Sequence, residues 1–342
     1  MRYGIRNSLR YSFKLDRVSN SLVACAVVGI GLWLMFSFQL GLSGALFIVA
    51  AQSIAGINAH NLPINRLAIA SKVSCIYLLV VLMGIYSRNS LLYVSLAMVL
   101  LAYLFSFLKQ YYPINWPDIV IPAAALFLMS HIAHEYWSCV LYTFLGCLLG
   151  ISVEILVVLG LMKYGKRYVP MKPLATNEKS RNDKSPILGL KEANRRYALE
   201  MSFLLIASGV LMHFIPFPHS YWAPLTIIMV VQVGNQGAFR RISQRILGTL
   251  VGCSLGALIL HCSTHVIYFV LAIIVCVYFW QYYIRQNYMV GSAFVTAFVL
   301  ILLGMDKGNP IYLAMERLSF STLGGLMALG SSWIFATQRR VS

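Results

Sequence analysis

The sequence predicts an all-α polytopic membrane protein with about twelve transmembrane helices, arranged as two parallel six-helix repeats. Of its 342 residues, 59% are hydrophobic and only 11% are charged, and the mean hydropathy is +0.75. An ordinary soluble chain carries about 25% charged residues. Apolar runs recur along the whole chain at lengths near the roughly 20 residues that cross a bilayer as a helix. Because these runs show no two-residue alternation, a transmembrane β-barrel is disfavoured.

The chain opens with a basic segment, residues 1–18, which we expect at the cytoplasmic face of the membrane. It is either a short amphipathic stretch on anionic lipid or a simple positive flank. Residues 19–162 follow as the first six-helix half, because polar separators rich in Asn and Pro divide them into apolar runs. The predicted helices of this half are 19–38, 40–58, 67–86, 90–108, 118–134 and 139–162.

A basic cytoplasmic linker is predicted for residues 163–196, which contain ten Lys and Arg but only three acidic residues. The segment is too short and too poor in apolar residues to form a domain. Residues 197–336 follow as the second six-helix half, and residues 337–342 form a cytoplasmic tail. The predicted helices of the second half are 197–215, 222–236, 245–261, 264–282, 288–304 and 311–336.

The distribution of basic residues predicts the orientation of the chain. With the N-terminus inside and twelve crossings, 24 of the 27 Lys and Arg lie on the cytoplasmic side, and only Arg88, Lys307 and Arg317 lie outside. Such a bias is the positive-inside rule, so we expect a bacterial inner-membrane protein with both termini in the cytoplasm. The same placement accounts for the net charge of +17 without a nucleic-acid partner.

The two halves resemble each other in sequence. Gln52 and Arg66 are 14 residues apart in the first half, and Gln232 and Arg245 are 13 apart in the second. Both pairs run from the second helix of a half to the start of its third. The last helix of each half also carries a small-residue step. An even number of helices per half predicts parallel repeats, an architecture that places a transport pathway between the halves.

The richest stretch of the sequence is 221–256, where polar residues interrupt two apolar runs. Tyr221 and Trp222 are typical of the membrane interface, and Pro224 suits the first turn of a helix. The run that follows is short before a Gly- and Asn-containing break, and short interrupted segments indicate transporter binding sites. We therefore place the substrate path here and at its repeat partner, 43–52. The path residues are Tyr221, Trp222, Thr226, Gln232, Arg240, Arg241, Arg245 and Gln52.

Each of these path residues also has a structural interpretation. Thr226 and Gln232 can hydrogen-bond a neighbouring helix in place of a substrate. The three arginines can form an anion-collecting mouth, since guanidinium groups pair bidentately with carboxylates, or they can serve only to fix the topology. Arg245 is the strongest of the three, because it opens a helix directly.

A glycine ladder with four-residue spacing follows Arg245. Such a face lets two helices approach closely, so we interpret it as a packing surface that holds the site. The residues assigned to helix packing are Pro224, Gly248, Thr249, Gly252 and Gly256.

Acidic residues inside apolar runs are candidates for coupling transport to protons. We name Glu316, with its neighbour Arg317, and Glu154. Adjacent residues do not face each other on a helix, so Glu316 and Arg317 must have separate partners. Glu154 has a second interpretation as the partner of a linker lysine.

We expect no cofactor and no resident metal. His131, His134 and Glu135 have the i, i+3, i+4 spacing of metal ligands on one helix face, but they form neither HExxH nor its inverse. Interfacial histidines without a ligand are the preferred interpretation. No GxxxxGK[ST] sequence occurs, so no ATP site of that type is visible.

The residues of the second half resemble a known family. The run YWAPLT, then Gln232, then RR followed by QRxxGTxxGxxLG is similar to the fusaric acid resistance (FUSC) and aromatic acid exporter group, with which plant aluminium-activated malate transporters are usually grouped. The likeness covers roughly 196–340 and continues at Trp280, Arg285, Tyr288, Glu316 and Arg317. It implies export or permeation of small organic anions, often aromatic carboxylates.

Three functions follow from these observations. The first is an inner-membrane exporter of aromatic or other hydrophobic carboxylates, coupled to the proton gradient. The second is an anion channel of the malate-transporter type. The third is an intramembrane enzyme, which is disfavoured because no set of nucleophile, base and orienting group is present. The expected partners are the lipid bilayer, the organic anion and, as an option, further copies of the chain.

Overall fold

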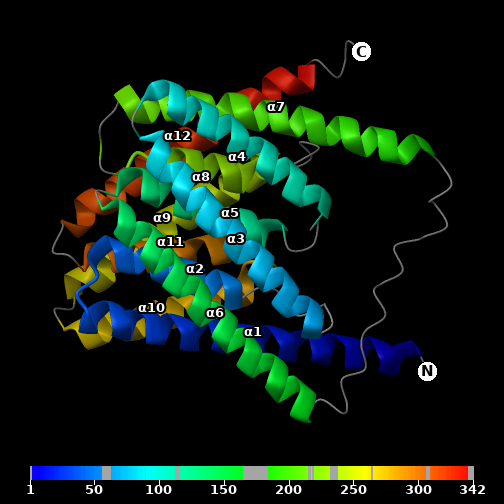
Figure 1. The fold of residues 1–342 in the computed structure, drawn as a ribbon, viewed down its shortest axis with the longest axis vertical. Helices are drawn as coiled ribbons and strands as arrows, with labels where there is room; N and C mark the ends of the chain where they lie inside the picture. The colour runs from blue at the N-terminus through cyan, green and yellow to red at the C-terminus, as the bar shows by residue number, and fades with distance from the viewer. Residues whose placement is uncertain are drawn as a thin grey trace.

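The computed structural model describes residues 2–55, 63–88, 90–111, 116–133, 135–164, 184–214, 217, 219–231, 238–262, 265–305 and 309–337. In these ranges the chain forms twelve α-helices and no strand (Figure 1). They are α1 (Arg2–Ser37), α2 (Gly41–Ala55), α3 (Pro63–Ser87), α4 (Leu91–Tyr111), α5 (Trp116–Ile132), α6 (Tyr136–Tyr164), α7 (Lys184–Phe214), α8 (Trp222–Val230), α9 (Ala238–Cys262), α10 (Val266–Tyr283), α11 (Tyr288–Gly304) and α12 (Pro310–Thr337).

The structure confirms an all-α polytopic membrane protein. Among the described helices, seven are long and apolar enough to cross a membrane, and three shorter ones are also apolar. Many large apolar side chains are exposed on the outside of the bundle, Trp137 and Trp333 among them. Exposing so much apolar surface to water is unfavourable, whereas contact with lipid tails is not.

Three helices extend further than the sequence predicts. The basic N-terminal segment is not separate, because α1 begins at Arg2 and continues into the first apolar run. The predicted linker is partly helical at both ends, since α6 continues to Tyr164 and α7 begins at Lys184. The remainder of the linker, 165–183, and the tail beyond Thr337 lie outside the described residues.

Helices of the two halves have corresponding neighbours. In the first half α2 packs against α6, and α3 packs against α5 and α6. In the second half α8 packs against α12, and α9 packs against α11 and α12. Between the halves, α4 contacts α7 and α1 contacts α10. When each helix is replaced by its counterpart in the other half, the first of these pairs becomes the second. Figure 1 shows the first of these pairs along one side of the molecule and the second along the opposite side.

Close glycine contacts fix the two short helices α2 and α8. Gly146 of α6 lies against the backbone oxygen of Phe47, and Gly324 of α12 lies in the same way against that of Ala223. These contacts match α2 with α8, and by the same register Gln52 corresponds to Ile228. Gln232, which the sequence paired with Gln52, lies outside the described residues. The short helix predicted at 222–236 is shorter still, because α8 has nine residues and Val231 is extended.

The glycine ladder of α9 packs against α11. A Cβ atom built on Gly248 would lie 2.6 Å from the backbone oxygen of Met289, and one on Gly256 would lie 2.8 Å from the Leu300 side chain. On Gly252 it would contact the backbone oxygen of Ala293 directly. The three glycines and Arg245 lie on the same buried face of α9. The ladder therefore presses this face, and Arg245 with it, onto α11.

Replacing Gly252 with alanine is expected to lower the free energy of unfolding by about 1–3 kcal/mol, because the new methyl group meets backbone that cannot rotate away. The matched control is Gly160→Ala in α6, where a Cβ atom would meet no other heavy atom within 4 Å. Thermal unfolding of the purified variants in detergent measures both. Equal stability of the two variants would contradict the packing role of the ladder.

Candidate functional site

Arg245 is the centre of the candidate site. Its side chain is 1% exposed, and its Nη1 donates a hydrogen bond of 2.9 Å to Oγ of Ser292 on α11. Its Nε and Nη2 find no hydrogen-bond partner among the residues that the structure describes. These two groups form one edge of the guanidinium plane, the edge that binds a carboxylate through two parallel hydrogen bonds. Arg245 thus keeps its carboxylate-binding edge free inside the protein.

Arg317 of α12 is the second buried cation. It is 2% exposed, and its guanidinium carbon lies 4.8 Å from the centre of the Trp222 ring. Its Nε and Nη1 have no partner in the described part of the chain. The charge of Arg245 acts on Arg317, and both charges act on the thiol of Cys253. We call Arg245, Arg317 and Trp222 the cationic centre.

The location of Arg317 differs from the expectation. Its position in the sequence places it with the outer charges, whereas the structure buries it between helices. A buried guanidinium without an opposite charge is unfavourable, because it has lost water and gained no carboxylate.

No carboxylate neutralises the cationic centre in the described chain. The ion pairs found there are Arg66 with Glu154, His219 with Glu316 and Arg285 with Asp118. None of them includes Arg245 or Arg317. The centre therefore places two positive charges in the protein interior, and an anion is the ligand that this arrangement favours.

Further polar groups lie one helical turn from the two arginines. Thr249 follows Arg245 by four residues, and Ser321 follows Arg317 by four, so each shares a helix face with its arginine. The Oγ1 of Thr249 and the Oγ of Ser321 are buried, and neither has a partner in the described ranges. These hydroxyl groups are further donors that could bind an anion. The buried Nε1 of Trp222 is another.

The other predicted path residues differ in their surroundings. Tyr221 is buried beside Trp222. The hydroxyl of Thr226 donates a hydrogen bond of 2.8 Å to the backbone oxygen of Trp222. Arg240 is exposed, and the guanidinium carbon of Arg241 lies 5.0 Å from the Tyr288 ring. Of the three clustered arginines, only Arg245 reaches the interior.

Gln52 and Pro224 are both buried. Pro224 lies in the first turn of α8, as expected for a proline. The Nε2 of Gln52 has no hydrogen-bond partner among the described residues. The structure gives no contact between Gln52 and the cationic centre.

Glu154 pairs with Arg66, and not with a linker lysine. The Nη2 of Arg66 donates a hydrogen bond of 3.0 Å to Oε1 of Glu154, and both side chains are buried between α3 and α6. The charge of Glu154 is thus already balanced, which weakens its candidacy for proton coupling. Among the described residues, the first half of the chain neutralises its buried arginine, whereas the second half leaves Arg245 and Arg317 without an opposite charge.

Glu316 and Arg317 have separate partners. The Nδ1 of His219 lies 2.6 Å from Oε2 of Glu316, while Arg317 lies over Trp222. In the sequence His219 is one of six histidines expected on the outer side, and nothing there pairs it with Glu316. Its partner is 97 positions away, so no local spacing pointed to it.

The residues considered for a metal have other partners. The Nδ1 of His131 lies 2.9 Å from Oγ of Ser87, and Oε2 of Glu135 accepts a hydrogen bond of 2.7 Å from Ser138. His134 lies outside the described residues. Within the described ranges, no group of three His, Cys, Asp or Glu could hold a metal ion.

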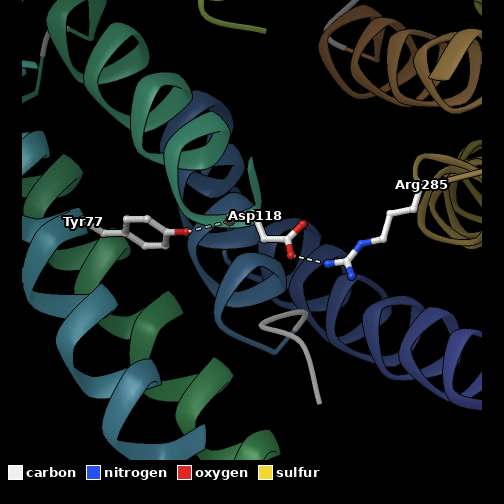
Figure 2. A network of polar contacts seen from close by, with 3 residues as sticks. All are labelled: Tyr77, Asp118 and Arg285. Carbon is white, nitrogen blue, oxygen red and sulfur yellow. Dashed lines mark hydrogen bonds and ion pairs between the residues drawn. The ribbon is translucent and has the colours of Figure 1, made fainter. Parts of the chain in front are cut away.

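A polar network joins the two halves at the end of the bundle that the sequence places in the cytoplasm. Figure 2 shows Arg285, which follows α10, in an ion pair with Asp118 in the first turn of α5. The hydroxyl of Tyr77 donates a hydrogen bond of 3.4 Å to the backbone oxygen of Asp118. Arg285 is 40% exposed, so this contact contributes at most about 1 kcal/mol. Its significance is positional, because it joins α5 to the other half.

Comparison with known proteins gives one family and two relatives. Residues 206–330 match the model of the fusaric acid resistance protein-like family. The uncharacterized protein slr1298 of Synechocystis is 28% identical over 144 residues, which is 42% of this chain and 19% of the relative. The uncharacterized protein YhfK of Escherichia coli is 27% identical over 152 residues, which is 43% of this chain and 21% of the relative. No solved structure matches.

The matched segments thus span about a fifth of each relative. The match at 206–330 contains Trp222, Arg245 and Arg317. It confirms the family resemblance of the second half, while the relation to plant malate transporters stays a prediction. Residues 206–330, the part of the chain that holds the cationic centre, are similar to the fusaric acid resistance protein-like family.

Proposed function

We propose that this membrane protein exports small organic anions, preferentially aromatic or other hydrophobic carboxylates, and that transport is coupled to the proton gradient. The observation that carries the proposal is the pair of buried guanidinium groups, Arg245 and Arg317, which lack a carboxylate partner in the described chain. The family match supports a transport role for the same segment.

A carboxylate suits the free edge of Arg245. It would accept two parallel hydrogen bonds from Nε and Nη2, and its charge would offset the two positive charges. Charge-assisted hydrogen bonds of this kind are stronger than neutral ones, and they gain further where water is excluded. A hydrophobic or aromatic body on the substrate suits the surrounding apolar helices better than a polar one would.

The packing pattern supports a transport path between two parallel repeats. The short helices α2 and α8 have equivalent neighbours in the two halves, and glycines fix both of them. We propose that substrate passes beside α8, from a cytoplasmic mouth toward the outer end of the helix. In this arrangement both termini lie in the cytoplasm, and the protein resides in the bacterial inner membrane.

Flux into proteoliposomes tests the proposal. The purified full chain is reconstituted, and the movement of benzoate is compared with that of acetate, with and without a pH gradient across the membrane. We expect protein-dependent flux of the aromatic acid to exceed that of the aliphatic one and to respond to the gradient. A steady anion current that needs no pH gradient would instead establish the channel alternative. No protein-dependent flux of either anion would overturn the proposal.

We propose no enzymatic activity. Of the residues considered for a metal, which an enzyme of this kind could use as its centre, His131 is hydrogen-bonded to Ser87 and Glu135 to Ser138. Chelator-sensitive turnover of a substrate, without anion transport, would revive the enzyme alternative.

A further inference from the structure

A histidine and a glutamate lie beside the cationic centre. His219 precedes α8, and its Nδ1 lies 2.6 Å from Oε2 of Glu316 on α12. The His219 ring also stacks on Trp222, with ring centres 4.7 Å apart and planes 17° from parallel. Trp222 thus contacts both His219 and Arg317. Through this tryptophan and through the helix of Glu316 itself, the pair is connected to the anion site at two points.

The pair can take up a proton from the outer solution. His219 is 25% exposed, whereas Glu316 is 7% exposed. With one proton, held on Nδ1 and donated to the carboxylate, the pair carries a net charge of −1. A second proton, on the exposed side of the imidazole or on the carboxylate, brings the net charge to zero. Histidine is the side chain whose ordinary titration falls in the physiological range.

The groups around the pair set its electrostatic role. Arg317 is the next residue of α12, Tyr312 lies one turn earlier on the same helix, and Tyr221 directly precedes α8; the charge of Glu316 acts on both tyrosines. The positive charge of Arg245 on α9 acts on the guanidinium group of Arg317. The tyrosines are neutral at physiological pH. Among the described residues named here, the negative charge is therefore that of Glu316, which directly precedes Arg317 in the sequence.

We infer that the His219–Glu316 pair is the proton-binding element of the anion site, so that proton binding at the pair and anion binding at the cationic centre strengthen each other. The inference rests on the proposed function. A proton on the pair cancels the negative charge next to Arg317, which leaves the full positive charge of the centre for the anion. By linkage, a bound anion raises the proton affinity of the pair by the same factor.

This coupling has a consequence for transport. A monoanion that moves together with one proton carries no net charge across the membrane. The direction of net flux then depends on the sum of the anion and proton gradients. Export proceeds when the anion concentration inside exceeds that outside by more than the opposing proton gradient.

Flux measured against external pH tests the inference. The full chain is reconstituted, and benzenesulfonate is the probe because a sulfonate stays ionised between about pH 5 and pH 8, the range in which histidine titrates. Benzoate is measured in parallel, and the flux of protein-free liposomes is subtracted from both. We expect wild-type flux to rise on acidification by about 5-fold or more, the usual lower bound for coupling between two sites.

The variants separate the pair from its surroundings. Glu316→Gln removes the negative charge and keeps His219, so at alkaline pH its flux should already be close to the acidic wild-type level. His219→Gln removes the exposed proton site and keeps the carboxylate, so its flux should be independent of pH and close to the alkaline wild-type level. The matched control is Glu135→Gln. The carboxylate of Glu135 is exposed and accepts a hydrogen bond from Ser138, three residues later, so this variant should keep the wild-type pH response.

The outcomes distinguish the two proposals. Absence of wild-type flux for both probes at every pH would overturn the proposed function. A wild-type pH response that persists in His219→Gln, or an alkaline flux of Glu316→Gln no higher than that of the wild type, would overturn the inference alone. If Glu316→Gln fails to fold, His219→Gln decides, because its side chain is partly exposed and a retained pH response in it contradicts the pair's role.

Discussion

Replacing Arg245 with methionine is expected to lower anion flux at least tenfold while raising the stability of the folded protein. The wild-type side chain holds a charge inside the bundle with two N–H groups unpartnered in the described chain. Methionine removes that charge at similar length. The lost carboxylate-binding edge corresponds to at least about 1.4 kcal/mol of binding, which is tenfold. Relief of the buried charge should stabilise the fold by roughly 1–4 kcal/mol.

Two measurements on one preparation test whether flux falls while stability rises. Flux is measured in proteoliposomes, and the midpoint of thermal unfolding is measured in detergent without substrate. Lys72→Met is the matched control, because Lys72 is an exposed cation on α3 and should affect neither quantity. A destabilised Arg245→Met with normal flux per folded molecule would show that Arg245 is structural.

Replacing Glu154 with glutamine should have the opposite effect. The change leaves the Arg66 guanidinium buried without its charge partner at 3.0 Å. Removing one member of a buried ion pair typically lowers the free energy of unfolding by about 3–5 kcal/mol. We expect flux per folded molecule to change little, because the pair lies in the half of the chain without the cationic centre.

A double variant checks the cause of this loss. Arg66→Met combined with Glu154→Leu removes both charges, and replacing a buried pair by apolar side chains is often neutral or stabilising. Thermal unfolding of the two variants should therefore show recovery in the double one. If the double variant is as unstable as Glu154→Gln, packing and not charge explains the loss.

The sequence predicts most of the fold, because lipid imposes long apolar helices and leaves few alternatives. The run after Trp222 is short because a Gly- and Asn-containing break follows it, and α8 is indeed short. The spacing of Gly248 and Gly252 indicates close packing, and these glycines lie against α11. Such features are local, so neighbouring residues suffice to predict them.

The candidate site is less predictable, because its contacts join residues that are far apart in sequence. Arg66 meets Glu154 across 88 positions, and His219 meets Glu316 across 97. Arg317 is assigned to the outer charges when only its position between apolar runs is considered. Its burial follows from the packing of α12 against α8 and α9, which no spacing within α12 reveals.

The nine residues of α8 extend about 14 Å, less than half of the roughly 30 Å of bilayer hydrocarbon. Eight of the nine are buried in protein, so this helix is shielded from lipid. Where water enters at both ends of such a helix, the low-dielectric distance that an ion must cross is shorter than the bilayer. The membrane voltage then falls over a shorter length, and an anion there experiences a steeper electric field.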